Sequence, residues 1–292
     1  MLSIVLALAI GQGAVWTKPL LLPVLAVAMT LSTIGITNRD LASIKSTPRL
    51  IPVSLLLNYV VLGGIVLLMT RGLIDDSDVW LGLLVITAMP PAISVVPFSY
   101  MLGGNMAFAL IGTTGLYLAA LGLTPAIMML LLGADFLKPV ELMLILVQLI
   151  VIPLVISRIL LSKGLAQSID RWRDTAVNWC VFIVNFTIIG LNRQILFDQP
   201  DVLLKVAIIA AAVTFGIGHA TNYIAGKLHI DWPTRISWMV MSTRKNSGLA
   251  SIIAIAFLSE RAAFPAAIFA IFEILSIMWW GFYLKRRGQV NL

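Results

Sequence analysis

Two adjacent basic residues, Arg244 and Lys245, stand in the middle of the otherwise apolar stretch Trp238–Phe257. A charged side chain at the centre of a bilayer costs at least about 2.5–3.5 kcal/mol, so such residues face a cavity, a partner or a substrate. Lys245 is the first candidate for coupling or for attracting an anion. The alternative is an interfacial loop, but apolar residues on both sides favour a buried position.

The residues around this pair predict that two spans are interrupted. Under a shift of 156 residues, Gly104–Leu110 aligns with Glu260–Ala266, and Pro90-Pro91-Ala92 falls on Asn246-Ser247-Gly248. Prolines remove backbone donors, while Asn, Ser and Gly favour non-helical backbone. Matched interruptions in two halves of a chain indicate a transporter binding site. An ordinary proline kink beside a coincidental match is the alternative.

Other polar residues in the apolar stretches are further candidates. We expect Glu273 to pair with Arg244 or Lys245. The oxygens of Thr113, Thr114 and Asn58 either face a cavity or bond to neighbouring backbone. His219 and Asn222 lie in a glycine-rich stretch, which favours an interhelical hydrogen bond over a position in the cavity wall. Asn178, Asn185 and Asn192 recur every seven residues on one helix face, which either lines the cavity or contacts a neighbouring helix.

The elements that carry these residues are predicted to be membrane helices. Hydrophobic residues make up 60% of the chain and charged residues 11%, whereas a soluble domain carries about 25% charged residues. Alternation with a period of two, the mark of a β-barrel, is absent. The fold class is therefore an all-α polytopic membrane protein. The one cysteine, Cys180, is expected to pack as a small apolar residue, and no cleavable signal peptide is expected.

Apolar stretches of about 20 residues, the length that spans a bilayer as a helix, recur along the chain. We predict ten spans: Leu2–Ala14, Pro19–Ile36, Leu50–Thr70, Val79–Leu102, Met106–Leu132, Val140–Leu161, Thr175–Leu196, Val202–Ala225, Pro233–Leu258 and Ala263–Leu284. The clearest loops are Asn38–Arg49, Arg71–Asp78 and Ser162–Asp174. Ten spans with matched interruptions predict two inverted five-helix repeats in which the fourth and ninth helices are broken and cross.

The distribution of basic residues predicts the orientation. With the N-terminus in the cytoplasm, the inner loops and the C-terminal tail hold 12 Lys and Arg residues and the outer loops hold 6. Because inner loops are enriched in Lys and Arg, both termini are expected in the cytoplasm. Trp279-Trp280, before the basic tail, indicates an anchor at the membrane interface.

These motifs resemble the bile acid:sodium symporter superfamily. The similar segments are Asn246–Ala250, Met89-Pro90 with Tyr100 and Gly104-Asn105, Leu123-Thr124-Pro125, and Gly35–Thr37 with Asp40 and Pro48-Arg49. The resemblance implies a panel domain from residues 1–49 and 138–200, and a core domain from 50–137 and 201–292. It also implies that a small organic anion binds between the domains and crosses by alternating access.

The chain departs from this superfamily at the sodium ligands. The resemblance would place Met241 at the family's ninth-span acidic residue, Lys245 at its glutamine, and Val95-Val96 at a fourth-span Ser-Asn pair. Asn58 and Thr113 are the possible residual sodium ligands. Oxygen ligands are what hard cations require, so the usual sodium sites are expected to be lost. No cofactor is expected. The coupling ion stays open between proton, sodium and none, with Lys245 either a fixed charge or a group that loses its proton.

We therefore predict a secondary transporter of a small organic anion in a bacterial cytoplasmic membrane, as a monomer or homodimer, with no nucleic-acid partner. The alternatives are a sodium-coupled symporter with rebuilt ion sites, a permease similar to arsenite exporters, and a membrane sensor that binds without transport. Arsenite exporters carry an acidic residue resembling Glu273 but also a fourth-span cysteine, where Met89 or a neighbour stands here. Enzyme motifs are missing from the sequence, and nothing resembles a channel filter.

Overall fold

The computed structural model describes residues 2–35, 49–133 and 138–286, and the regular elements in these ranges are all helical. Residues 36–48, which hold most of the predicted loop Asn38–Arg49, lie outside them. The elements up to residue 133 are α1 (Leu2–Ile10), η1 (Gly11–Gly13), α2 (Ala14–Thr17), η2 (Lys18–Leu20), α3 (Leu21–Ile34), α5 (Leu50–Leu55), η3 (Leu56–Leu62), α6 (Gly63–Leu73), α7 (Ser77–Ala88), α8 (Val95–Met101) and α9 (Met106–Leu132).

The second part of the chain continues the same pattern. Its elements are α10 (Pro139–Leu146), η5 (Val147–Val151), α11 (Ile152–Ser162), α12 (Ala166–Leu191), α13 (Arg193–Asp198), α14 (Pro200–Ala211), η6 (Ala212–Ile217), α15 (Gly218–Lys227), α16 (Trp232–Met241), α17 (Ser247–Phe257), η7 (Arg261–Ala263) and α18 (Phe264–Arg286). Three of these elements, η3, η5 and η6, are π-helical and lie inside longer helices.

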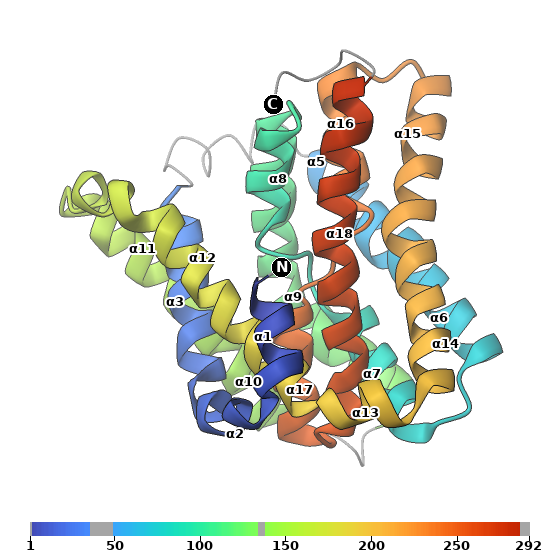
Figure 1. Cartoon of the computed structure of the whole chain (residues 1–292). Coiled ribbons are helices and arrows are strands. Elements are labelled where there is room, and N and C mark those ends of the chain that lie inside the picture. The colour runs from blue at the N-terminus through green and yellow to red at the C-terminus, as the bar shows by residue number, and fades with distance from the viewer. Residues whose placement is uncertain (1, 36–48, 134–137, 287–292) are drawn as a thin grey trace.

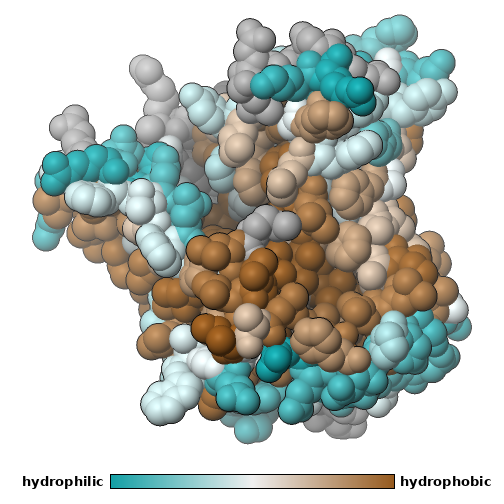
Figure 2. Space-filling view, viewed as in Figure 1, coloured by the Kyte–Doolittle hydropathy of each residue, from teal (hydrophilic) through white to brown (hydrophobic). Residues whose placement is uncertain are grey.

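The helices make an integral membrane protein. Seven described helical stretches are long and apolar enough to cross a membrane. Figure 2 shows apolar side chains in a band across the middle of the molecule, with hydrophilic ones toward both ends. A band of this kind matches the hydrocarbon core of a bilayer between its two polar interfaces.

Helices occupy all ten predicted spans once bends and breaks are followed in the described residues. Figure 1 shows α1 and α3 running in opposite directions with α2 at the turn, so the stretch Leu2–Ile34 holds two spans. Short 3-10 segments, η1 with its two glycines and η2 with Pro19, make this turn. The fourth span is the pair α7 and α8, and the ninth is α16 and α17.

One predicted loop is wrong. Most of Ser162–Asp174 is helical, because α12 begins at Ala166 and not near Thr175. The first turns of this helix are polar, so the sequence predicted a loop here. The charged side chains of these turns pair with one another along the helix surface. Arg173 lies 2.7 Å from Asp170 one turn away, in the arrangement that supports an exposed helix.

The helices form two packing groups, which Figure 1 shows on the two sides of the molecule. In one group α3 packs along α11 and α12, and α1 packs along α12. In the other, α7 packs against α9, α17 and α18, while α14 also packs on α18. Helix α12 touches both α17 and α18 and so joins the groups. The panel and core boundaries given by the sequence stay a prediction.

The two halves of the chain repeat the same irregularities. The π-helical segment η3 starts at Leu56 and η6 starts at Ala212, a separation of 156 residues. This equals the shift that aligns the two interruption motifs in the sequence. The broken pairs α7–α8 and α16–α17 occupy corresponding places. The predicted repeat of five helices is therefore visible in the backbone itself.

Candidate substrate and coupling site

The two broken helices meet at their interruptions. Residues 89–94 separate α7 from α8, and residues 242–246 separate α16 from α17. The backbone N–H of Asn246 donates to the carbonyl of Pro90 over 2.9 Å, so the two breaks touch directly. In Figure 1, α8 and α16 lie in one half of the molecule and α7 and α17 in the other. Pro90 and Pro91 are buried here and shape the crossing.

Lys245 is held at the end of α7. Its Nζ donates to the carbonyl oxygens of Thr87, over 3.0 Å, and Met89, over 2.7 Å. It also lies 4.1 Å from the centre of the Tyr59 ring, a cation–π contact. The last carbonyls of a helix carry partial negative charge and have no partner within the helix. The amine, on a residue only 1% exposed, supplies hydrogen-bond donors to this end of the helix.

Arg244 points in another direction, as adjacent positions on the chain require. Its guanidinium donates to the backbone carbonyl of Glu273 over 3.0 Å and to the Ser276 hydroxyl over 3.1 Å. The guanidinium carbon lies 4.5 Å from the centre of the Phe98 ring. Arg244 is 2% exposed, so the interfacial-loop alternative for the basic pair is wrong. Its Nε has no hydrogen-bond partner among the described residues.

Glu273 does not form the expected side-chain ion pair. No ion pair joins its carboxylate to Arg244 or Lys245 among the described residues. Its Oε1 instead accepts from the backbone N–H of Lys245, at 3.4 Å, and from the Ser247 hydroxyl, at 3.3 Å. The reason is geometric, because Lys245 turns its amine toward α7 and Arg244 reaches the Glu273 backbone. The three charged groups still share one site.

Asn58 fastens the third span to the second break. Its Nδ2 donates to the carbonyls of Met241, over 3.0 Å, and Arg244, over 2.9 Å. Asn58 lies in the π-helical segment η3, whose wider turn leaves backbone irregularities typical of functional positions. Its Oδ1 is buried with no partner in the described part of the chain.

A cavity of about 130 Å³ lies between the two packing groups at this crossing. Helices α3 and α12 line one side of it, and the residues of the breaks with α18 line the other. Its polar lining is Ser94, Asn185, Arg244, Lys245, Asn246, Ser247 and Glu273, and the rest is apolar apart from the backbone of Gly248. Asn246 caps α17 by accepting from the N–H of Leu249, and Ser247 and Gly248 form its first turn. Helix N-termini of this kind favour anions.

Several predicted residues lie elsewhere. Thr113 and Thr114 are buried in α9 but do not line this cavity, and neither hydroxyl has a partner among the described residues. His219 accepts from the Trp279 indole over 3.2 Å and packs on Trp280, which is the kind of interhelical contact that the sequence favoured.

Of the three asparagines predicted to share a helix face, only Asn185 lines the cavity. Asn192 bonds to its own helix at Ile188, and Asn178 is exposed. Sequence reasoning also missed two aromatic partners of the cations, Tyr59 and Phe98. Aromatic residues are common in apolar spans, so the sequence carried no signal for them.

Charged residues tie the packing groups together at the end of the molecule where α2 lies. Lys18, at the turn before α3, forms an ion pair with Glu260, in the connection before α18. Nearby, Arg261 pairs with Asp76, which caps α7. The hydrogen bond from Arg261 holds the pKa of the Asp76 carboxyl below its usual value. The Lys18–Glu260 pair thus joins the two packing groups at this end of the molecule.

Two broken helices that cross beside a cavity, in repeats of opposite orientation, define the inverted-repeat class of membrane transport proteins. Within that class, the model of the SBF-like CPA transporter family matches residues 2–282, and the chain belongs to this family. The resemblance to bile acid:sodium symporters seen in the sequence is therefore confirmed.

The chain is also similar to a protein of Bacillus subtilis (strain 168) described as "Uncharacterized sodium-dependent transporter YocS". The two are 24% identical over 243 residues, which cover 81% of this chain and 74% of that protein.

Proposed function

We propose that the protein is a secondary transporter of a small organic anion, works by alternating access, and uses the Lys245 ammonium where relatives would bind a cation. The observation that carries this proposal is the pair of carbonyl contacts of Lys245 at the end of α7. With both cations and Glu273 ionised, the site keeps one net positive charge. That charge, beside the N-terminus of α17, favours an anion in the cavity.

The second candidate is a sodium-coupled symporter with rebuilt ion sites. The printed description of the Bacillus relative favours it. The residues of this chain favour the lysine instead, because the carbonyl oxygens of Thr87 and Met89 already accept from Nζ. The arsenite-exporter alternative loses support, since the described residues that line the cavity include no cysteine. A sensor that binds but does not transport is an outcome of the test below.

The test compares wild type with Lys245→Ala and Lys245→Met, purified in sodium, potassium or choline chloride at equal ionic strength. A bound ion raises stability by RT ln(1 + [L]/Kd), about 2.7 kcal/mol at a hundredfold excess over Kd. We expect the wild-type melting temperature to be the same in the three salts. In Lys245→Ala, which vacates the ammonium position beside two carbonyls, we expect sodium to stabilise. Lys245→Met fills that position with an apolar chain and serves as the matched control.

Uptake of candidate carboxylates into proteoliposomes completes the test. We expect wild-type transport without a sodium gradient and loss of transport in Lys245→Met, with the variant still monodisperse. Sodium-specific stabilisation of wild type would overturn the lysine proposal and favour the symporter. Binding of the anion without uptake would favour the sensor.

A further inference from the structure

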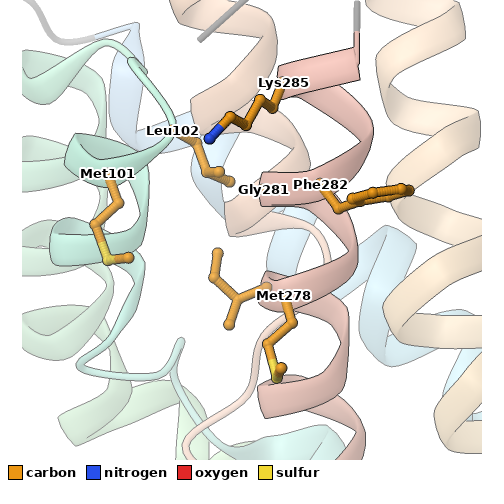
Figure 3. Close-up of a pocket in the computed structure, with 7 residues that line it drawn as sticks. Met101, Leu102, Met278, Gly281, Phe282 and Lys285 are labelled. Carbon is orange, nitrogen blue, oxygen red and sulfur yellow. The ribbon is translucent and has the colours of Figure 1, made fainter. Parts of the chain in front are cut away.

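A second cavity, of about 300 Å³, lies between α8 and α18 and shares no lining residue with the central one. Figure 3 shows its two walls, formed by the end of α8 and by the last turns of α18. The residues that line it, which we call the α8–α18 groove, are Met101, Leu102, Ile277, Met278, Gly281, Phe282 and Lys285.

On α18 the groove continues the face that lines the central cavity. Ile274 lines the central cavity, and Ile277, Gly281 and Lys285 line the groove. These residues follow one another at steps of three or four positions, which keep side chains on one face of a helix. The same face of α18 therefore borders both cavities, and about one helical turn separates the last residue of one lining from the first of the other.

On α8 the same spacing holds. Phe98 lines the central cavity, and Met101 and Leu102, three and four residues later, line the groove. Figure 1 shows α12, which lines the opposite side of the central cavity, diverging from α8 and α18 toward the end of the molecule where α18 ends. The groove thus lies where the two packing groups diverge, along faces that already serve the central cavity.

Phe98 stands at the boundary between the two cavities. The centre of its ring lies 4.5 Å from the guanidinium carbon of Arg244. That guanidinium is held on α18 by the carbonyl of Glu273 and the hydroxyl of Ser276. The ring and the cation together therefore bridge α8 and α18 at the level where the central cavity ends. Because the ring makes no hydrogen bond, it can turn away while Arg244 keeps its own partners on α18.

We propose that the α8–α18 groove is the outer part of the passage by which the cargo anion reaches the central cavity, with Phe98 as the gate between the two. This inference rests on the proposed function, since it takes the central cavity as the binding site. The lining of the groove is apolar apart from Lys285. It therefore offers an anion fewer polar partners than the central cavity does, as suits a passage that releases what enters it.

The first test asks whether the groove holds water or faces lipid. In a Cys180→Ala background, in membranes opened so that an impermeant maleimide reaches both faces, Met101→Cys and Gly281→Cys are compared with Ile224→Cys. Ile224 is exposed on α15, outside both cavities, and no farther from the end of its helix than Gly281. The thiolate is the reactive form, and apolar surroundings disfavour it. We therefore expect both groove cysteines to react several-fold faster than the control.

The second test asks whether Phe98 separates the cavities. Ser94 lines the central cavity, so the reaction of Ser94→Cys reports access to it. We expect Phe98→Ala to raise this rate several-fold and Phe98→Tyr, which keeps the ring, to leave it close to the rate with Phe98. Phe98→Leu keeps an apolar side chain but removes the cation–π contact, so it gives the same reading if Phe98→Ala is not monodisperse.

Groove cysteines that react no faster than Ile224→Cys would overturn the proposal and place the groove against lipid. An unchanged rate for Ser94→Cys in folded Phe98→Ala or Phe98→Leu would overturn it as well, because the ring would then separate nothing. Labelling needs no transport. Failure of the passage would therefore leave uptake into proteoliposomes as it is, whereas failure of uptake alone would leave these rates as they are.

Discussion

At the residue scale, Lys245 and Asn58 have the same role as hydrogen-bond donors to backbone carbonyls. Each donates to two backbone carbonyls that a broken helix leaves without partners, Lys245 at α7 and Asn58 beyond α16. Within a membrane such carbonyls cost several kcal/mol each if they stay unsatisfied. The two side chains therefore make the interruptions tolerable. They differ in charge, and only the lysine leaves the site more positive.

Asn58→Leu keeps the size of the side chain but removes both hydrogen bonds. We expect a loss of about 1–3 kcal/mol in unfolding free energy for each carbonyl left buried and unpaired. Thermal unfolding in detergent measures the loss as a fall in melting temperature. Asn178→Leu is the control, because Asn178 is exposed on α12 and should tolerate the change. A variant at Asn58 as stable as this control would contradict the role assigned to its amide.

At the scale of elements, the sequence predicted both breaks but misplaced the second. Proline gives an unambiguous signal, and the first break, residues 89–94, contains Pro90 and Pro91. The Asn246-Ser247-Gly248 triplet was expected to interrupt its helix. Instead Asn246 caps α17 and the next two residues start it, so the break is residues 242–246. Asn is favoured both in breaks and at caps, and only the backbone distinguishes the two.

The partners within the site were less predictable than the elements. The π-helical segments have no sequence signature, so the wide turn that carries Asn58 could not be foreseen. The direction of the lysine amine depends on where the end of α7 lies in space, 158 residues away in the chain at Thr87. Charge alone suggested Glu273 as its partner. The residue types along the chain do not reveal which distant backbone carbonyls the amine contacts.

The ion pair between Lys18 and Glu260 belongs to the same scale, because it joins the two packing groups. Both side chains are partly exposed, at 37% and 51%, so we expect Lys18→Gln to change stability by less than about 1 kcal/mol. We expect it instead to favour opening of the cavity toward this end. A cysteine introduced by Ser94→Cys in a Cys180→Ala background should then react faster with an impermeant maleimide added from that side.

The charge reversal Lys18→Glu with Glu260→Lys restores the attraction and should return the reaction to the wild-type rate. Unchanged labelling in Lys18→Gln would show that this contact does not hold the groups together.

At the scale of the whole molecule, the uneven distribution of basic residues predicts both termini in the cytoplasm. Lys163 and Asp75 are both exposed, and the prediction puts them on opposite sides of the membrane. In a Cys180→Ala background on intact cells, an impermeant maleimide should label Asp75→Cys and spare Lys163→Cys until the cells are opened. The reverse pattern would invert the topology and leave the fold unchanged.

The tethered position of Lys245 has an electrical consequence. A symporter that takes up sodium with its anion can move no net charge, whereas a cation that is part of the chain never leaves with the cargo. In the mechanism proposed above, with no coupled ion, each monovalent anion crosses alone and feels the full membrane voltage, about 2.3 kcal/mol per 100 mV. With the cell interior negative, that voltage drives the anion outward. The proposed mechanism therefore predicts export of the cargo unless the cargo is far more concentrated outside.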